Sequence, residues 1–182
     1  MILSTERLLL REFEEHDWRP MLDYQSKPEY LLYNPWIYRT EMDVRSYLHM
    51  FMDWRNDQPR KKFQLAVILK DENRLIGNCG IRMAQSHART ADLGYEIDNR
   101  YWRRGYATEA ARAMLAFGFE QLYLHRIWAH CVLENSASAA VLEKIGMTYE
   151  GCQRESEWMK GCWWSTKLYS ILDHEWPVTR HR

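Results

Sequence analysis

Apolar residues along this chain recur with two different periods, and the order in which these periods alternate predicts a mixed α/β domain. Helical spacing, with apolar residues at i, i+3, i+4 and i+7, marks the segments 17–24, 40–57, 106–121 and 136–145. Short apolar runs bounded by turn residues mark strands at 6–12, 63–69, 75–83, 92–98, 127–132, 148–157 and 163–172. About four helices and about seven strands in this order predict a central mixed sheet that is mostly antiparallel.

Local signals support several element boundaries. Thr40, followed by Asp43, is a near relative of the capping box and predicts a helix start. Asp17 is expected to cap the preceding helix, and Pro28 to end that helix or follow its end. The segment 85–90 is expected to be a loop.

Composition and charge narrow the function classes. The chain has 182 residues, of which 46% are hydrophobic, so a single packed domain over 1–182 is expected rather than a disordered chain. Lys and Arg together number 25, as do Asp and Glu, so no net field would draw nucleic acid or an anionic membrane. No apolar stretch approaches the roughly 20 residues that span a bilayer. Neither nucleic acid nor membrane is therefore expected as a partner.

The four cysteines, Cys79, Cys131, Cys152 and Cys162, are scattered and show no paired spacing typical of metal ligands. No metal site is therefore expected. The first ten residues lack the apolar core of a signal peptide, and scattered cysteines are typical of proteins in a reducing compartment. Together these features predict a cytoplasmic protein.

The stretch 99–111 carries the strongest candidate chemistry. A predicted strand ends just before it and a predicted helix begins at Tyr106, with Arg103, Arg104 and Gly105 at the joint. A helix start has backbone N–H groups without internal partners and a partial positive charge, and a glycine lets a phosphate approach the backbone closely. These residues predict a phosphate-binding site. The alternative is an ordinary strand-to-helix loop whose two arginines point into solvent.

Four motifs, in this order and at this spacing, resemble the GNAT (GCN5-related N-acetyltransferase) superfamily over nearly the whole chain. They are Leu93-Gly94-Tyr95, Tyr101-Trp102-Arg103-Arg104-Gly105-Tyr106-Ala107-Thr108-Glu109-Ala110, Asn135-Ser136-Ala137-Ser138, and Lys144-Ile145-Gly146-Met147 before Glu150-Gly151. Within the superfamily the chain is similar to the RimJ/RimL-type enzymes that acetylate ribosomal-protein N-termini. The resemblance implies the GNAT fold, in which two central strands splay apart and form a slot for acetyl-CoA.

The resemblance also implies which residues bind acetyl-CoA. Backbone amides of the phosphate loop would hold the pyrophosphate, and the strand before the loop would pair with the pantetheine arm as an added strand does. The loop residues are Arg103, Arg104, Gly105, Tyr106, Ala107 and Thr108, the strand residues are Ile97, Asp98 and Asn99, and the contacts from the following helix start are Asn135 and Ser138. Arg103 replaces a glycine that is usual in the RimJ/RimL branch. Its side chain has two alternative interpretations: it contacts a phosphate, or it points into solvent.

Acetyl transfer to an amine needs a base for the amine, a polarised thioester carbonyl and an acid for the departing thiolate. The RimL-like pattern implies Glu157 as the base and Ser138 as the acid. Glu96 competes as the base, because other superfamily members carry a glutamate on the corresponding strand. The alternative for Glu157 is a solvated charge without a catalytic role. The alternative for Ser138 is a hydroxyl that bonds a backbone N–H at the start of a helix. Leu142 stands where many members have a tyrosine acid, and Ser165 where an aspartate is frequent.

These residues predict an acetyl-CoA-dependent N-acetyltransferase whose expected acceptor is a protein or peptide N-terminal α-amine. A small amine, such as a polyamine, an aminoglycoside or an amino-acid-like metabolite, is the alternative acceptor. A non-catalytic CoA-binding module is the alternative class. The aromatic stretch 30–38 fits either packing beneath a loop or the wall of an acceptor pocket. Trp163, Trp164 and Trp176 fit either core positions or a homodimer interface.

Overall fold

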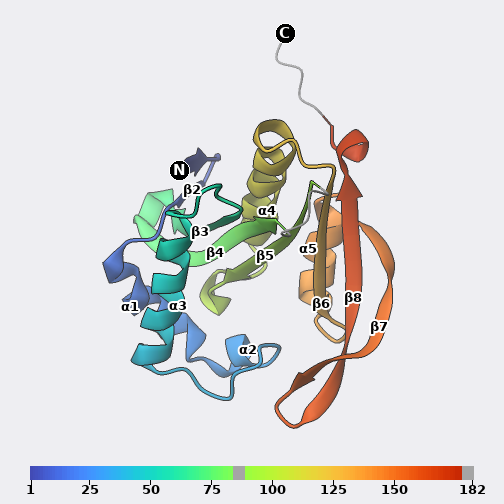
Figure 1. Cartoon of the computed structure of the whole chain (residues 1–182). Helices are drawn as coiled ribbons and strands as arrows, with labels where there is room; N and C mark the ends of the chain where they lie inside the picture. Colours follow the sequence, from blue (N-terminus) through green and yellow to red (C-terminus); the bar gives the residue numbers. More distant parts are fainter. Residues whose placement is uncertain (84–88, 178–182) are drawn as a thin grey trace.

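The computed structural model describes residues 1–83 and 89–177, and most of the loop expected at 85–90 lies outside them. Within these residues an eight-stranded sheet, in the order β1-β2-β3-β4-β5-β6-β8-β7, forms the centre of the molecule (Figure 1). The strands are β1 (Ile2–Ser4), β2 (Leu8–Arg11), β3 (Lys62–Leu69), β4 (Arg74–Met83), β5 (Thr90–Ile97), β6 (Arg126–Val132), β7 (Thr148–Met159) and β8 (Cys162–Leu172). All neighbouring pairs are antiparallel except β5 and β6, which confirms the mixed, mostly antiparallel sheet.

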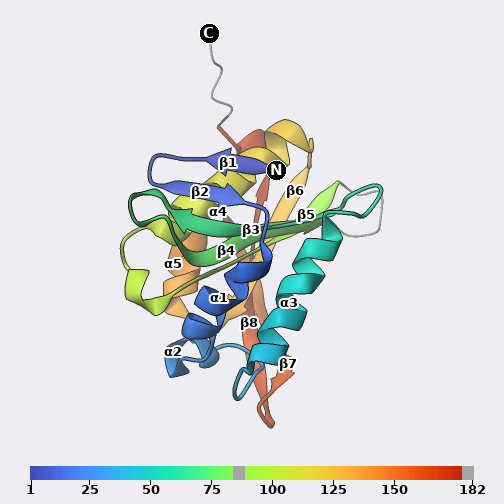
Figure 2. The same cartoon turned by 90° about the vertical axis from the view of Figure 1, so that its left-hand side faces the viewer.

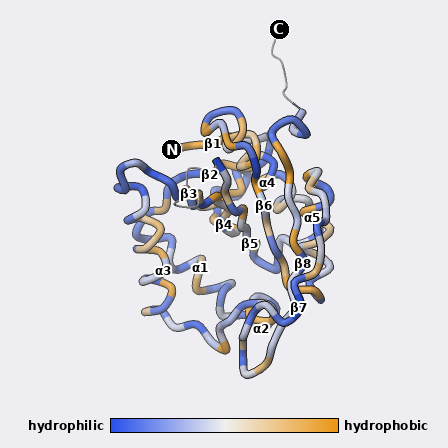
Figure 3. The backbone as a smooth tube through the Cα atoms, turned by 45° about the vertical axis from the view of Figure 1, so that its right-hand side comes forward, coloured by the Kyte–Doolittle hydropathy of each residue, from blue (hydrophilic) through white to orange (hydrophobic). Residues whose placement is uncertain are grey.

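Helices cover both faces of the sheet (Figures 1 and 2). One face carries α1 (Trp18–Gln25), the short α2 (Pro28–Leu31) and α3 (Glu41–Trp54), and the other carries α4 (Tyr106–Ala116) and α5 (Ser136–Lys144). Residues alternate between the two faces along β3, so Leu65 and Val67 belong to the core with α4, and Ala66 and Ile68 to the core with α1 and α3. Figure 3 shows hydrophobic and hydrophilic residues alternating along helices and strands, which is the pattern that predicts these elements.

The smaller core, beneath α1 and α3, borders the candidate site and is rich in aromatic rings. Tyr30 is buried, and its ring stacks on Trp36 with centroids 6.3 Å apart, while Ile37 and Tyr38 beside them are 74% and 70% exposed. The aromatic stretch 30–38 therefore divides into a packed part and an exposed part.

Four details differ from the prediction, and one of them is the short α2, which the sequence analysis did not predict. Pro28 follows the end of α1, as expected, and begins α2, because the fixed φ of proline suits the first turn of a helix. Asp17 precedes α1 without capping it, since its carboxylate accepts hydrogen bonds from Arg11 and from the backbone of Glu14. The helix that begins with α4 changes to a π-helical turn at Phe117–Gln121. β1 pairs with β2 and adds a strand at the edge of the sheet.

Candidate active site

The parallel strands β5 and β6 are paired only where they begin. The ladder joins residues 90–92 to residues 126–128, and across this seam the structure pairs none of the described residues 93–97 and 129–132. The two strands diverge toward their carboxyl ends (Figure 1). Their facing peptide groups are therefore available to an extended ligand, and the splayed strand pair implied by the sequence is present.

The loop after β5 ends in a helix start that no side chain caps within the described structure. Gly105 is the N-cap residue of α4 and has a φ of +82°, a left-handed conformation that glycine adopts without strain. The first internal bond of the helix runs from Glu109 N to Gly105 O at 3.0 Å, so the N–H groups of the preceding turn point outward. Residues 102–105 are exposed, which leaves these N–H groups open to an anion.

Glu109 fastens this helix start to the turn between β1 and β2. Its carboxylate accepts hydrogen bonds from Thr5 Oγ1 at 2.6 Å, from Arg7 N at 2.9 Å and from Arg7 Nε at 2.7 Å. Arg7 Nη1 also donates to Arg104 O at 3.0 Å, and the guanidinium lies 4.5 Å from the Tyr106 ring centroid. Burial alone would raise the pKa of Glu109, but the bonds from Thr5 and Arg7 outweigh it and lower the pKa.

Cations without carboxylate partners surround the same helix. Among the described residues, Arg103, Arg104, Arg112 and Lys144 form no ion pair. A cavity of about 590 Å³ runs along the outer face of α4, and its lining includes Gly105, Arg112 and Lys144. Arg112 Nη2 donates to Lys144 O at 2.7 Å, which holds its guanidinium at the cavity. Open backbone N–H groups and free cations around one cavity suit the polyanionic end of a large ligand.

The residues at the end of β5 already use part of their hydrogen-bonding capacity. Trp102 Nε1 donates to Ile97 O at 2.6 Å, and Asp98 N donates to the carbonyl of Ile76 at 2.8 Å. Asn99 Oδ1, in contrast, is buried and has no hydrogen-bond partner in the described structure. A buried acceptor without a partner is unusual in a folded protein, and here it stands beside the slot, where a ligand donor could reach it.

Ser138, on the first turn of α5, meets β5 across the slot. Asn135 Oδ1 accepts a hydrogen bond from Ser138 N at 3.0 Å and so caps α5. Ser138 Oγ lies 2.9 Å from the hydroxyl of Tyr95, which also donates to Ser138 O at 3.0 Å. Burial raises the pKa of Tyr95, so its hydroxyl remains protonated. The sequence motif contained Tyr95, but the sequence did not show that it joins Ser138. Leu142, at the position of the family tyrosine, is buried in the core.

Glu96 points to the opposite face of β5, beneath α1 and α2. Its Oε1 accepts hydrogen bonds from the Tyr24 hydroxyl at 2.6 Å, from Gln25 Nε2 at 2.7 Å and from Asn78 Nδ2 at 2.5 Å. Its Oε2 accepts one bond, from the Tyr30 hydroxyl at 2.7 Å. Burial, followed by the nearby Glu96 carboxylate, raises the pKa values of Tyr24 and Tyr30 well above their usual range, so both remain donors.

Glu157 lies on the exposed outer part of β7, near the tip of the β7–β8 hairpin. It pairs across the ladder with Trp164, next to a bulge between Gln153 and Glu157. Within the described part of the chain its carboxylate forms no hydrogen bond or ion pair. The structure therefore brings Ser138 together with Tyr95, and Glu96 with its four donors, but records no contact between Glu157 and either cluster.

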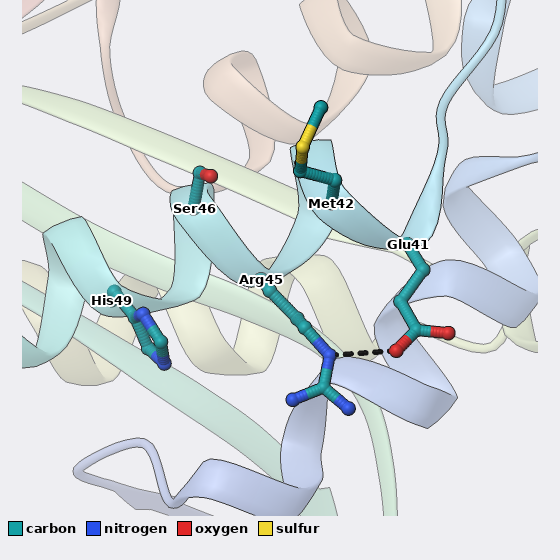
Figure 4. Close-up of a pocket in the computed structure, with 5 residues that line it drawn as sticks. All are labelled: Glu41, Met42, Arg45, Ser46 and His49. Carbon is teal, nitrogen blue, oxygen red and sulfur yellow. Dashed lines mark hydrogen bonds and ion pairs between the residues drawn. The ribbon is translucent and has the colours of Figure 1, made fainter.

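A second hollow, of about 430 Å³, lies on the solvent-facing side of α3 and is lined by Glu41, Met42, Arg45, Ser46 and His49 (Figure 4). Its side chains belong to one helix, and Arg45 pairs with Glu41 in it at 2.8 Å. Among the residues that the structure describes, no cluster of His, Cys, Asp and Glu is arranged to hold a metal ion. No helix in that part of the chain is both long and apolar enough to cross a bilayer.

Comparison with known proteins agrees with this geometry. Residues 7–148 match the family model described as an acetyltransferase (GNAT) domain. The uncharacterized N-acetyltransferase YnaD of Bacillus subtilis is 37% identical, over 97% of this chain and 99% of that protein. The [ribosomal protein uS5]-alanine N-acetyltransferase of Escherichia coli is 24% identical over 98% of this chain and 94% of that protein. A crystal structure of a GNAT-family acetyltransferase from Bacillus anthracis superposes with a TM-score of 0.84 at 35% identity, covering 96% of this chain and 99% of that one.

Proposed function

We propose that this chain, which belongs to the GNAT family of acetyl-CoA-dependent N-acetyltransferases, acetylates the N-terminal α-amine of a protein or peptide. The observation that carries the proposal is the slot between β5 and β6, with an open helix start on one side and a buried carboxylate cluster on the other. One relative is named for acetylating a ribosomal protein, which supports the same acceptor class.

For acetyl-CoA, the residues present fit the groups of the ligand. The amides of residues 103–108, with the side chains of Arg103 and Arg104, would bind the pyrophosphate. Arg112 and Lys144, which line the cavity on α4, would meet further phosphate. Residues Ile97, Asp98 and Asn99, together with Asn135, would bond the pantetheine arm, and the unpartnered Asn99 Oδ1 is the acceptor best placed for one of its amide N–H groups.

For the acceptor, we propose that Glu96 takes the proton of the attacking amine through Oε2, which accepts a single bond. An α-amine, with a pKa of about 7.7–8.0, is partly neutral at physiological pH and needs only a modest base, whereas a lysine amine at about 10.4 needs more. The charges near Glu96 favour this acceptor over a polyamine. Arg82 pairs with Asp92, and Arg39 bonds Gln25, which donates to Glu96, so two cations lie near this carboxylate and disfavour a polycation there.

For the leaving thiolate, we propose that Ser138 donates the proton and that Tyr95 supports it. The two hydroxyls are in hydrogen-bond contact at 2.9 Å, at the edge of the slot where the thioester would lie. Tyr95 keeps its own proton, because burial raises its pKa, and its hydroxyl holds Ser138 Oγ in place. Ser138 would regain its proton from solvent after the thiol leaves.

The test is a thiol-release assay with acetyl-CoA against N-terminal peptides, polyamines and aminoglycosides, with mass spectrometry to locate the acetyl group. Release with peptides beginning in alanine or serine, and acetylation of their α-amines, is the expected result. Turnover with spermidine but not with peptides would replace the proposed acceptor by a polyamine. Binding of acetyl-CoA without release on any acceptor would favour a non-catalytic CoA-binding module.

A further inference from the structure

Arg39, in the loop before α3, is a buried cation whose nearest recorded acidic neighbour, the exposed Asp43 in the first turn of α3, is close enough for the Arg39 charge to lower its pKa but forms no ion pair with it in the described structure. Arg39 is 9% exposed, and its guanidinium lies 4.1 Å from the Trp36 ring centroid and 5.2 Å from that of Tyr47. Its Nε is buried and lacks a hydrogen-bond partner, and it forms no ion pair within the residues that the structure describes. Burying a charge without compensation is costly, so a nearby group of opposite charge is expected.

Gln25 connects this cation to the candidate base. Its side chain is fully buried; Oε1 accepts a hydrogen bond from Arg39 Nη2 at 3.1 Å, and Nε2 donates to Glu96 Oε1 at 2.7 Å. The carbonyl end of the amide therefore faces the cation and its N–H₂ end faces the carboxylate. The Gln25 amide lies between two opposite charges, and both charges favour the same orientation of the amide.

Among the described groups around Glu96, Arg39 is the cation connected to it through a single side chain. Tyr24 on α1, Tyr30 on α2 and Tyr47 on α3 face the carboxylate as neutral phenols. On β4, Arg82 also connects to Glu96, through Gln64 and Asn78, but its Nε donates to Asp92 Oδ2 at 2.8 Å. Arg82 therefore has a carboxylate of its own in direct contact, whereas Arg39 forms no ion pair in the described structure and reaches Glu96 through one amide.

We propose that Arg39 is a positioning residue that keeps Glu96 ionised, acting through the Gln25 amide. Without the cation, Glu96 binds a proton more readily, and a larger share of the enzyme lacks a base at acidic pH. The inference rests on the proposed function, specifically on Glu96 as the base.

The experiment compares the pH dependence of kcat/KM for wild-type protein with that of Arg39→Met, Arg39→Lys and Gln25→Met. Arg39→Met is expected to move the acidic limb to higher pH by about one unit, which is typical for the loss of an opposite charge. Arg39→Lys retains the charge and is expected to restore most of the wild-type profile. In the Gln25→Met background, Arg39→Met is expected to shift the limb less than it does alone.

Arg45→Met is the matched control. Arg45 also lies over a tryptophan, 4.2 Å from the Trp18 ring centroid, but its ion pairs run to Glu15 and Glu41. This variant is expected to leave the acidic limb unchanged. The KM for acetyl-CoA is expected to remain at the wild-type value in all variants, because Arg39 lies on the opposite face of the sheet from the phosphate loop.

A second readout separates failure of this inference from failure of the proposed function. The Glu96 carboxyl carbon, ¹³C-labelled and assigned with Glu96→Gln, can be titrated by NMR in wild type and in Arg39→Met whether or not turnover is found. An upward shift of its titration in Arg39→Met supports the inference even if every acceptor fails. Folded variants, verified by thermal unfolding, with an unmoved titration would overturn the inference. A moved titration with an unmoved acidic limb would instead reject Glu96 as the base. Removal of one member of a buried charge pair is destabilising, so Arg39→Met is expected to unfold at a lower temperature than Arg39→Lys, and its titration is measured below that temperature.

Discussion

Gly105 and Gly161 share a left-handed backbone, with φ of +82° and +79°, but only Gly105 borders the proposed acetyl-CoA site. An L-residue in this conformation costs about 1–2 kcal/mol at either position. A Cβ at Gly105 would also lie 3.4 Å from Arg7 Nη2 and would cover part of the helix start, whereas at Gly161 it would meet nothing within 4 Å. A comparison of Gly→Ala at the two positions therefore separates the loss of folding stability from the loss of affinity for acetyl-CoA.

We predict that Gly105→Ala lowers affinity for acetyl-CoA by about tenfold or more, because the added methyl hinders close approach of the pyrophosphate to the backbone N–H groups. Isothermal titration measures the affinity and thermal unfolding the stability. Gly161→Ala is expected to lose stability similarly and to bind acetyl-CoA like wild type. Equal affinity of the two variants for acetyl-CoA would show that the pyrophosphate does not bind at the turn of Gly105.

Two carboxylates compete for the role of base, and the structure distinguishes their surroundings. Glu96 accepts four hydrogen bonds beneath α1 and α2, whereas Glu157 is exposed on β7. Since general-base catalysis typically contributes about 10²–10⁴-fold, we predict that Glu96→Gln lowers kcat by about 100-fold or more and that Glu157→Gln changes it by less than about tenfold. Steady-state assays with the best peptide acceptor measure both. The reverse order would assign the base to Glu157, as the RimL-like pattern implies.

At the scale of elements, periodicity and caps predicted α1, α3, α4, α5 and the strands from β2 to β8, but not β1 or the short α2. The helix predicted at 40–57 runs from Glu41 to Trp54, and its start is the capping box of Thr40 and Asp43. Its end lacked such a signal and was placed too late. The partners of Glu96 could not be predicted, because the bonds from Tyr24 and Tyr30 span 72 and 66 residues of sequence. The sequence indicates only which residues of β4 and β5 share a face with Glu96, because every second side chain of a strand points to the same side.

The joint between β6, β7 and β8 provides an element-scale prediction. Glu150 on β7 accepts bonds from Arg126 Nη1 and Nη2, both at 2.6 Å, and from Ser170 Oγ at 2.6 Å. The Arg126 guanidinium, followed by the Ser170 hydroxyl, lowers the pKa of Glu150 from its usual 4.5 to about 2. A carboxylate whose pKa is lowered by folding stabilises the protein above its unfolded pKa, and this stabilisation is lost as pH falls toward the folded pKa.

We predict that Glu150→Gln is less stable than wild type by up to about 1 kcal/mol at pH 7, a modest value because the pair is partly solvated. The difference should shrink as pH falls below about 4.5 and nearly vanish toward about 2. Urea unfolding at several pH values measures it. Glu157→Gln, on the same strand without partners in the described structure, should show little difference at any pH. A Glu150→Gln deficit that grows in acid would contradict the linkage.

At the scale of the whole molecule, the slot divides the sheet into β1–β5 and β6–β8, which share one hydrophobic core beneath α4 but are paired as strands only along the short β5–β6 ladder. Tyr95 reaches Ser138 across the slot. At the open end, the Tyr33 hydroxyl donates to Glu134 O at 3.3 Å, and Lys160 Nζ, in the β7–β8 turn, donates to Leu32 O at 3.1 Å. The loop after α2 and the tip of the β7–β8 hairpin are thus adjacent (Figure 1). A ligand inserted between β5 and β6 would bond both parts at once.

We therefore predict that acetyl-CoA slows amide hydrogen exchange on both sides of the slot, at 93–97 on β5 and at 129–132 on β6, as well as at 103–108. At a concentration 100 times its Kd, a ligand that binds only the folded state adds about 2.7 kcal/mol of stability, which raises Tm by several degrees in a protein of this size. Exchange measured by mass spectrometry with and without acetyl-CoA tests the pattern, with Gly105→Ala as the weak-binding control. Protection at 103–108 without protection on β5 and β6 would mean that the phosphates bind while the pantetheine arm stays outside the slot. In that case the splayed strands would serve another purpose than holding the thioester.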